Sequence, residues 1–171
     1  MECSVSSLAR KLGVWTLVRQ VVEQSSGNSA GALLETVAAL PVRRSSAVRS
    51  LGSYVSRAGQ PVCIRLQFAV EPETLRETFL HELAHLCDHL TNQPGKRYRK
   101  AHGSGWISWA RRLGLDGRVR GRSEVLSELC QQRLKTVAVC RTCGAELRRL
   151  RRPSRRYQYL HRHCGGVFEP L

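Results

Sequence analysis

Two histidines four residues apart constrain the fold more than any other feature of this sequence. They stand in His81-Glu-Leu-Ala-His85, within residues 73–90, where Pro72 at the start and turn residues 91–95 at the end predict one long helix. Positions four apart lie one above the other on a helix, so both imidazoles project from the same face. Two imidazoles placed in this way can bind one Zn²⁺ ion, and we therefore predict a zinc site on this helix.

The glutamate between the two histidines could act as a general base at the predicted site. Zinc lowers the pKa of a bound water to about 7, and a carboxylate beside that water can take its proton as a general base. Glu82 follows the first histidine directly and faces the same region of the helix. The sequence thus predicts a catalytic zinc, with Glu82 activating a zinc-bound water for attack on a carbonyl group.

A catalytic zinc needs a third protein ligand and one open coordination position. His89 continues the four-residue spacing, but it lies about 12 Å along the helix from the first histidine, too far for one ion. His102 stands in a glycine-flanked loop that can return to the helix, and it is the preferred third ligand. Glu124 and Glu128, on a predicted helix further along the chain, are the alternative.

A second set of metal ligands lies near the end of the sequence. One pair, Cys140 and Cys143, has two residues between its members and a glycine after it, and the pair His161 and Cys164 repeats that spacing. These four residues predict a zinc ribbon with a structural Zn²⁺, and His163 is the rival for the fourth position. The remaining cysteines have no partner at metal-binding spacing and are interpreted as plain thiols: Cys3, Cys63, Cys87 and Cys130.

The chain is strongly basic, and the charge is unevenly distributed. It carries 28 Lys and Arg against 13 Asp and Glu, a net charge of +15, whereas residues 1–42 hold three basic and three acidic side chains. Residues 141–162 hold eight arginines and one glutamate, with Tyr157 and Tyr159 on a predicted strand where they could stack on bases. This pattern predicts DNA, including single-stranded DNA, as a partner. A second basic patch is predicted beside the zinc site: residues 96–100, Arg111, Arg112, Arg118, Arg120 and Arg122.

The periodicity of apolar residues predicts a mixed α+β architecture. Strict alternation predicts a strand over 62–68, with one or two partner strands within 42–55. We expect a domain over residues 1–136, with a helical N-terminal part over 1–40, and a ribbon over 137–171. Besides the long helix, helices are expected over residues 6–24, 30–40, 106–113 and 123–135.

The sequence shows neither a membrane span nor a signal peptide. The longest early apolar stretch, residues 14–22, is interrupted by Arg19 and is too short to cross a bilayer. No charged head, apolar run and small-residue cleavage site occur in order. We therefore expect a cytoplasmic protein without a membrane partner, in which seven cysteines serve as metal ligands and reduced thiols rather than disulfides.

These motifs together resemble the SprT/Spartan family of zinc metalloproteases. The resemblance is carried by Leu80-His-Glu-Leu-Ala-His85, by His102-Gly with Trp106 and Leu113-Gly114 after it, and by the upstream strand with Gly52-x-Tyr54. It covers roughly residues 40–168, and it implies a zincin-like (SprT-type) metalloprotease domain in which the three histidines bind zinc and Glu82 is the general base. His161 departs from the Cys-x-x-Cys that family members often carry there. The resemblance further implies substrates that are proteins attached to DNA, and a role in repairing DNA–protein crosslinks.

The sequence-based hypothesis is therefore a zinc endopeptidase that cleaves DNA-associated proteins. One alternative is a non-enzymatic DNA-binding or transcription-associated zinc protein, in which the histidine site is structural and Glu82 has no use. Another is a metallopeptidase that acts on free peptides, for which the basic charge is irrelevant.

Overall fold

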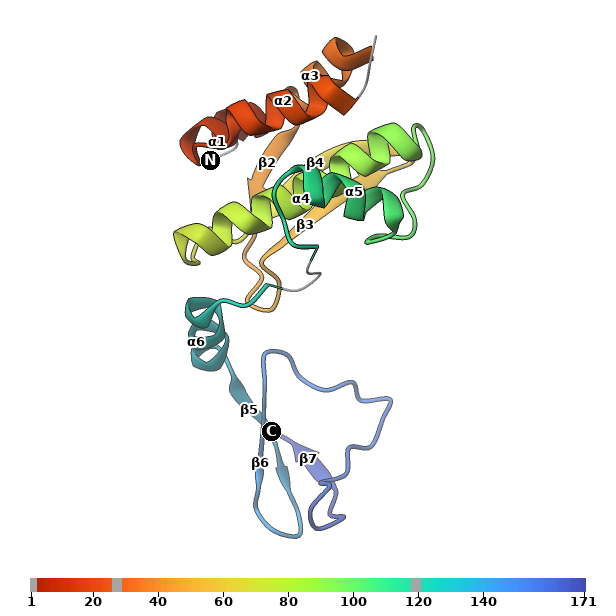
Figure 1. The fold of residues 1–171 in the computed structure, drawn as a ribbon. Coiled ribbons are helices and arrows are strands. Elements are labelled where there is room, and N and C mark those ends of the chain that lie inside the picture. Colours follow the sequence, from red (N-terminus) through yellow and green to blue (C-terminus); the bar gives the residue numbers. More distant parts are fainter. Residues whose placement is uncertain (1–2, 26–28, 118–120) are drawn as a thin grey trace. The chain divides into compact units, whose positions relative to one another are not determined.

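The computed structural model describes residues 3–25, 29–117 and 121–171, and the chain divides into two compact units (Figure 1). The first unit is Met1–Leu126 and the second is Ser127–Leu171. The boundary expected from the sequence, after residue 136, lies within strand β5 (Lys135–Cys140). Helix α6 (Glu124–Gln132) spans the division between the units.

The first unit contains a four-stranded mixed sheet in the order β1-β2-β4-β3. Strand β2 pairs in parallel with β4, and the other two pairings are antiparallel. The register places Val42, Tyr54 and Ile64 opposite one another, so these side chains share the face that turns toward the core. The strand predicted over 62–68 and its two partners are confirmed, whereas the short β1 was not predicted. The bounds are β1 Cys3–Ser4, β2 Pro41–Arg44, β3 Gly52–Arg57 and β4 Gln60–Leu66.

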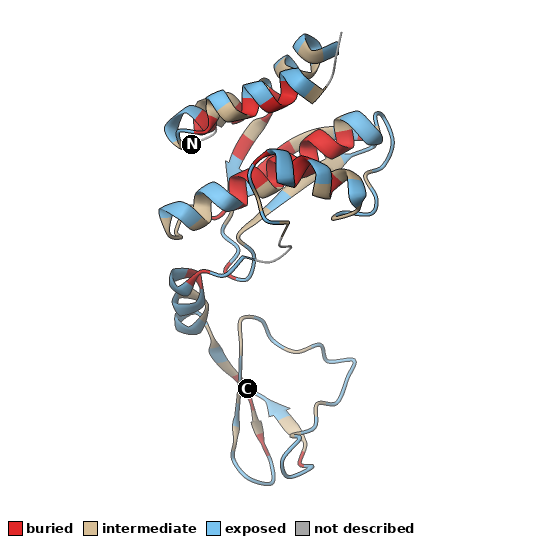
Figure 2. Cartoon of the chain, in the orientation of Figure 1, coloured by how far each residue is buried: buried red, intermediate tan, exposed pale blue. Residues whose placement is uncertain are grey.

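The long helix predicted around the histidine pair is confirmed as α4 (Pro72–Asn92). It packs on β3 and β4 with one face and on α5 (Ser104–Arg112) with another, as Figure 1 shows. Buried residues fill the middle of α4 (Figure 2), and fully enclosed side chains such as Phe79, Leu83 and Trp106 join the helices to the sheet. The core therefore fixes the segment that carries the histidine pair.

The prediction of one helix over residues 6–24 is wrong, because the chain forms two. Helix α1 (Val5–Lys11) has Leu12 as its C-cap, and α2 (Trp15–Ser25) begins after a turn. The turn requires Gly13, whose φ of +69° lies in the left-handed region that favours glycine. The apolar spacing continues through the turn, so periodicity alone does not reveal it. The next helix, α3 (Ala30–Ala39), agrees with the helix predicted over 30–40.

The second unit contains a three-stranded antiparallel sheet in the order β6-β5-β7. Besides β5, its strands are β6 (Glu146–Arg149) and β7 (Phe168–Pro170). The prediction of a strand through Tyr157 and Tyr159 is wrong, because this stretch consists of turns and irregular backbone that ends in a single bridge from Leu160 to Val167. The four arginines and one proline just before it give no alternating apolar face to hold a strand in place.

None of the helices in the described part of the chain is both long and apolar enough to cross a membrane.

Two glycine substitutions test the contact between β3 and α4. A Cβ at Gly52 would lie 2.7 Å from Thr78 Cγ2 and 3.1 Å from Glu82 Cγ, so Gly52→Ala should destabilise the first unit by about 1–3 kcal/mol through overpacking. Gly31 in α3 has no atom within 4 Å of its Cβ position, so Gly31→Ala should be neutral or stabilising by up to about 1 kcal/mol.

Urea unfolding followed by tryptophan fluorescence measures this difference in the first unit, because Trp15, Trp106 and Trp109 all lie there. Equal stability of the two variants would contradict the close approach of β3 to α4.

Candidate metal centres

Three histidine side chains converge on one point in the first unit. His81 and His85 come from successive turns of α4, and His102 comes from the loop before α5. Their Nε2 atoms lie 3.1 Å (His81 to His102), 3.1 Å (His85 to His102) and 3.2 Å (His81 to His85) apart. These three residues, called the histidine cluster below, therefore present three nitrogen atoms at mutual distances that one ion could bridge.

The donor set and its spacing fit a zinc ion. Two nitrogens that bind one tetrahedral ion at 2.0–2.1 Å lie about 3.3–3.4 Å apart, close to the separations found here. Imidazole binds metal in its neutral form. Burial, followed by the charge of the neighbouring histidines, lowers the pKa of His81 to about 4 and that of His85 to about 3, and burial also lowers the pKa of His102. The cluster is therefore neutral near pH 7, as a metal site requires.

The loop that carries His102 is held against α4 by an aromatic side chain. His102 has a φ of +67°, an uncommon conformation for a residue other than glycine, which turns the chain directly before α5. Trp106 in the first turn of α5 is fully buried, and its ring centroid lies 4.6 Å from that of His102 and 4.7 Å from that of His81. Its Nε1–H donates to the carbonyl oxygen of His81 at 3.3 Å. Trp106 thus fixes two members of the cluster relative to each other.

Glu82 lies beside the cluster in a largely desolvated position. Its side chain is 6 % exposed, lines the same open pocket as the three histidines, and accepts a hydrogen bond from the backbone N–H of Tyr54 in β3. Burial raises the pKa of Glu82 to about 7, although the Tyr54 hydrogen bond opposes this shift. The absence of a side chain at Gly52 allows β3 to approach this carboxylate closely. A buried carboxylate with such a pKa can exchange a proton near neutral pH.

The structure distinguishes among the candidates for a third ligand. His102 joins the cluster, whereas neither Glu124 nor Glu128 belongs to it among the described residues. Glu124 instead stands at the start of α6, where its backbone N–H donates to Glu71 Oε1 at 3.0 Å. His89 is 1 % exposed and donates from Nε2 to the Lys96 carbonyl oxygen at 2.8 Å, so it is a buried structural residue outside the cluster.

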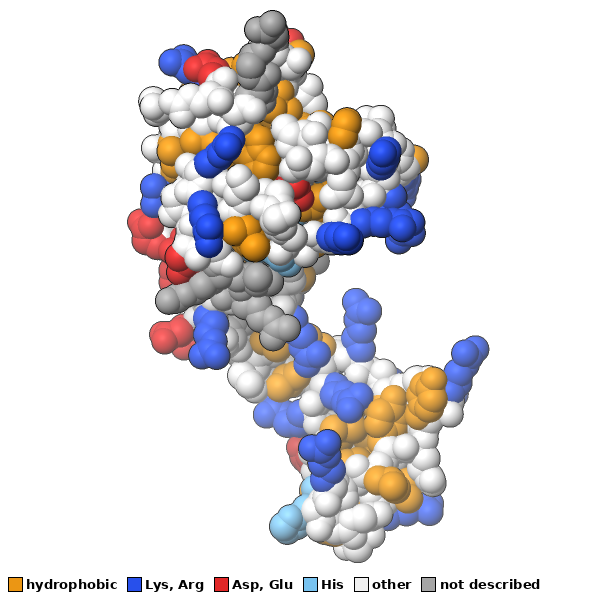
Figure 3. All heavy atoms as spheres, turned by 45° about the vertical axis from the view of Figure 1, so that its right-hand side comes forward, with side chains coloured by type: hydrophobic (Ala, Val, Ile, Leu, Met, Phe, Trp, Pro, Cys, Tyr) orange, Lys and Arg blue, Asp and Glu red, His pale blue; other side chains and the backbone are white. Residues whose placement is uncertain are grey.

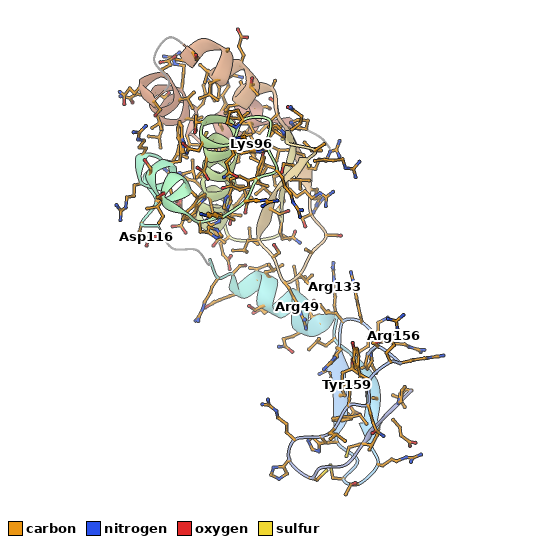
Figure 4. The ribbon with its side chains drawn as sticks, turned by 90° about the vertical axis from the view of Figure 1, so that its right-hand side faces the viewer. Arg49, Lys96, Asp116, Arg133, Arg156 and Tyr159 are labelled. Carbon is orange, nitrogen blue, oxygen red and sulfur yellow. The ribbon has the colours of Figure 1, made fainter. Side chains whose placement is uncertain are left out.

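A basic loop of residues 96–100 is fixed to the C-terminal end of α4, and Figure 4 shows Lys96 beside this helix. Gln93 donates from Nε2 to the Arg99 carbonyl oxygen at 2.9 Å and accepts from the Arg99 N–H at 2.8 Å. Four exposed cations of the loop thus stand near the pocket, while Tyr98 points inward to the cluster. Nothing in the sequence marks Tyr98 as part of the site, because a tyrosine between basic residues looks like part of a surface patch.

The four ligands predicted for the ribbon also come together in the second unit. Cys143 Sγ lies 3.1 Å from His161 Nδ1, which lies 3.2 Å from Cys164 Sγ, and Cys140 Sγ lies 3.5 Å from Cys164 Sγ. His163 is exposed and outside this ribbon cluster. Although burial raises the pKa of Cys140, backbone N–H donors at positions 143 and 142 lower it overall, which favours the thiolate that binds metal. This arrangement of one imidazole and three thiols could hold a zinc ion.

The second unit exposes aromatic and basic groups together. Figure 3 shows basic side chains around an apolar patch on the drawn face of this unit, and Figure 4 shows Arg156 and Tyr159 on its long loop. Tyr157 is 70 % exposed, and the Arg149 guanidinium lies 5.0 Å from the centre of the Tyr159 ring. Such surfaces suit stacking on bases and pairing with phosphates.

The second basic patch is only partly described. Arg118 and Arg120 lie outside the described residues, whereas Arg111, Arg112 and Arg122 are exposed. Arg112 is engaged within the first unit, because its Nη1 donates to Ser25 Oγ and its guanidinium lies 5.8 Å from the centre of the Trp109 ring. Part of this patch therefore supports the fold.

A mixed α+β unit that presents three converging imidazoles beside a buried carboxylate has the donor set of a metal-dependent hydrolase. Residues 42–125 match the model of the SprT-like family, which confirms the resemblance drawn from the sequence over this part of the chain. The chain therefore carries a SprT-like domain, of a family related to zinc metalloproteases, and this domain includes the whole histidine cluster. None of the curated proteins matches the chain.

Metal content tests the two clusters separately. The purified protein should hold about two zinc ions, and His102→Ala should reduce this to about one, because two imidazoles alone hold zinc weakly. His163→Ala, which removes an exposed imidazole outside both clusters, is the matched control and should keep both ions. Elemental analysis after gel filtration measures the ratio. Full zinc content in the His102 variant would move the third ligand elsewhere, with Glu124 as the next candidate.

Proposed function

We propose that this protein is a zinc-dependent endopeptidase with a zincin-like catalytic domain and a zinc ribbon. The observation that carries the proposal is the position of Glu82, a buried carboxylate on the same pocket as the histidine cluster. Burying an ionisable carboxylate costs free energy, which only a function or a partner offsets. A structural zinc site makes no use of such a group, so its presence indicates catalysis. The SprT-like domain match supports the same class of activity.

The proposed mechanism assigns one role to each part of the site. The histidine cluster would hold a catalytic Zn²⁺, which when bound supplies Lewis-acid polarisation of the scissile carbonyl and a lowered pKa of water. Glu82 takes the proton from the attacking water and then passes it to the leaving nitrogen. The backbone N–H of Tyr54 favours the ionised form of the Glu82 carboxylate, which is the form that acts as a base. The ribbon cluster would hold a second, structural Zn²⁺.

The neighbouring strand supports an extended peptide as the substrate. Strand β3 is an edge strand of the described sheet, and its residues Gly52, Ser53 and Tyr54 line the pocket together with the histidine cluster. The unpaired edge of such a strand can form backbone hydrogen bonds with an added chain. A polypeptide bound along β3 would bring a peptide bond to Glu82, which favours an endopeptidase over an enzyme for small substrates.

The charge distribution supports proteins on DNA as the substrate class. Of the net charge of +15, ribbon residues 137–171 carry +6 and loop residues 96–100 beside the pocket carry +4, and the exposed Tyr157 offers a ring for stacking on single-stranded bases. We therefore place the enzyme among those that remove proteins attached to DNA, as in the repair of DNA–protein crosslinks. The cytoplasm is the proposed compartment, and the alternative of a non-enzymatic DNA-binding zinc protein leaves Glu82 without a role.

Glu82→Gln tests the catalytic assignment. The amide has the same shape but cannot accept a proton as a base, so cleavage of a protein substrate should fall by about 10²–10⁴-fold while zinc content is unchanged. Glu73→Gln, an exposed carboxylate in the first turn of the same helix, is the matched control and should cleave at the wild-type rate. If the Glu82 variant cleaves as fast as the control, the histidine cluster is structural.

A charge-matched pair of double variants tests recruitment to DNA. Arg155→Ala with Arg156→Ala removes two exposed charges from the ribbon, and Lys11→Ala with Arg19→Ala removes two from the N-terminal helices. The ribbon variant should cleave a DNA-bound protein several-fold more slowly, and its cleavage rate should depend less steeply on salt concentration. The helix variant should match the wild type in both measurements. Identical salt dependence in both variants would favour a peptidase for free peptides.

A further inference from the structure

A chain of hydrogen bonds leads from one member of the histidine cluster to a buried carboxylate. His85 Nδ1 lies 2.9 Å from the Tyr98 hydroxyl oxygen, and that hydroxyl donates to Asp88 Oδ2 at 2.8 Å. Tyr98 comes from the basic loop, whereas the histidine and the aspartate come from consecutive turns of α4. These hydrogen bonds therefore connect the loop to the helix at the nitrogen of His85 that faces away from the cluster.

The chemistry of the three groups fixes the direction of these bonds. A carboxylate only accepts, so the single hydroxyl proton of Tyr98 is committed to Asp88. The Tyr98 oxygen must then accept from His85, whose Nδ1 carries the proton. In a neutral imidazole this leaves Nε2 with a free lone pair, and Nε2 is the atom directed at His81 and His102. These hydrogen bonds thus select the tautomer of His85 that can bind a metal ion.

Asp88, the last group in this series of hydrogen bonds, is a carboxylate that is costly to bury, and the surrounding residues leave space for it. Asp88 is 3 % exposed, and the two hydrogen bonds described for it come from neutral groups, Tyr98 and the side-chain amide of Asn92. A Cβ at position 105 would overlap Asp88 Oδ1, so Gly105 in α5 leaves the space that this group occupies. An ion in the histidine cluster would supply the positive charge that neutral donors do not.

We infer that Tyr98 and Asp88 are positioning residues for the metal ion in the histidine cluster, acting through His85. The inference rests on the proposed function, because it requires zinc at that cluster. Tyr98 holds the His85 ring in one orientation and one tautomer, and Asp88 makes the imidazole a stronger donor. Because Tyr98 belongs to the basic loop, the position of that loop and the metal affinity of the cluster are linked.

A pair of variants that each remove one hydroxyl separates this role from a merely structural one. Tyr98→Phe removes the hydroxyl between His85 and Asp88. Thr91→Val is the matched control, because it also removes a hydroxyl that joins α4 to a neighbouring element, accepting from Trp109 Nε1 at 3.1 Å, and it lies outside the cluster. Both variants should lose some stability, whereas only the first should alter metal binding.

The readouts are zinc affinity by chelator competition on the full chain and, in the zinc-free protein, the His85 tautomer by long-range ¹H–¹⁵N spectra. Cobalt substitution assigns each bound ion, because the thiolates of the ribbon give charge-transfer bands that the histidine cluster lacks. Tyr98→Phe should weaken zinc binding at the cluster by about 10–100-fold, and Nδ1 of His85 should no longer be the protonated nitrogen in all molecules. Asp88→Asn should show a smaller loss in the same direction.

The outcomes distinguish this inference from the function on which it depends. Wild-type protein that binds zinc at the cluster, together with a Tyr98→Phe variant of equal affinity and unchanged tautomer, overturns the positioning role and leaves the proposed peptidase intact. Equal losses in the Tyr98 and Thr91 variants also overturn it, because the effect would then be one of stability. Wild-type protein without zinc at the cluster overturns both.

Discussion

The mutual approach of three imidazole nitrogens is the constraint on which the rest of the first unit depends. Nε2 atoms at 3.1–3.2 Å from one another cannot all be satisfied by hydrogen bonds among themselves, because at least one pair must present either two lone pairs or two N–H groups to each other. A bound cation satisfies all three at once. The sheet, the two helices around the cluster and the ring of Trp106 are arranged so that these atoms meet.

Two glycines and the basic loop allow neighbouring elements to pack closely against α4 beside the histidine cluster. Glycine at position 52 allows the edge strand to reach the Glu82 carboxylate, and glycine at position 105 leaves room for Asp88. A larger residue at either place would separate α4 from a neighbouring element at the point where the chemistry is placed. The backbone of the basic loop is likewise bound to the end of α4 through Gln93 and His89, which keeps the loop beside the pocket. The neighbouring elements, the histidine cluster and the basic loop are thus all positioned by contacts with α4.

The helix with its histidines, the ribbon ligands and the central strand could be predicted because each depends on spacing along the chain. Residues four apart on a helix, or paired ligands with two residues between them, are brought together by local geometry alone. Other features depend on tertiary contacts that spacing does not encode. The turn at Gly13 interrupts an apolar stripe that continues through it, and Tyr157 and Tyr159 lie in irregular backbone although aromatic residues favour strands. The bond between Tyr98 and His85 joins residues 13 apart in the sequence through the fold of a loop.

Anomalous scattering at the zinc absorption edge, from crystals of the zinc-loaded full chain, tests the metal centre most directly. A peak should lie at about 2.0–2.1 Å from the Nε2 atoms of His81, His85 and His102, with the Glu82 carboxylate beside it but not bound to it. A second peak within the ribbon cluster provides the internal control for zinc loading. A peak in the ribbon alone, with the three imidazoles turned away from one another, would contradict the metal centre and the peptidase built on it.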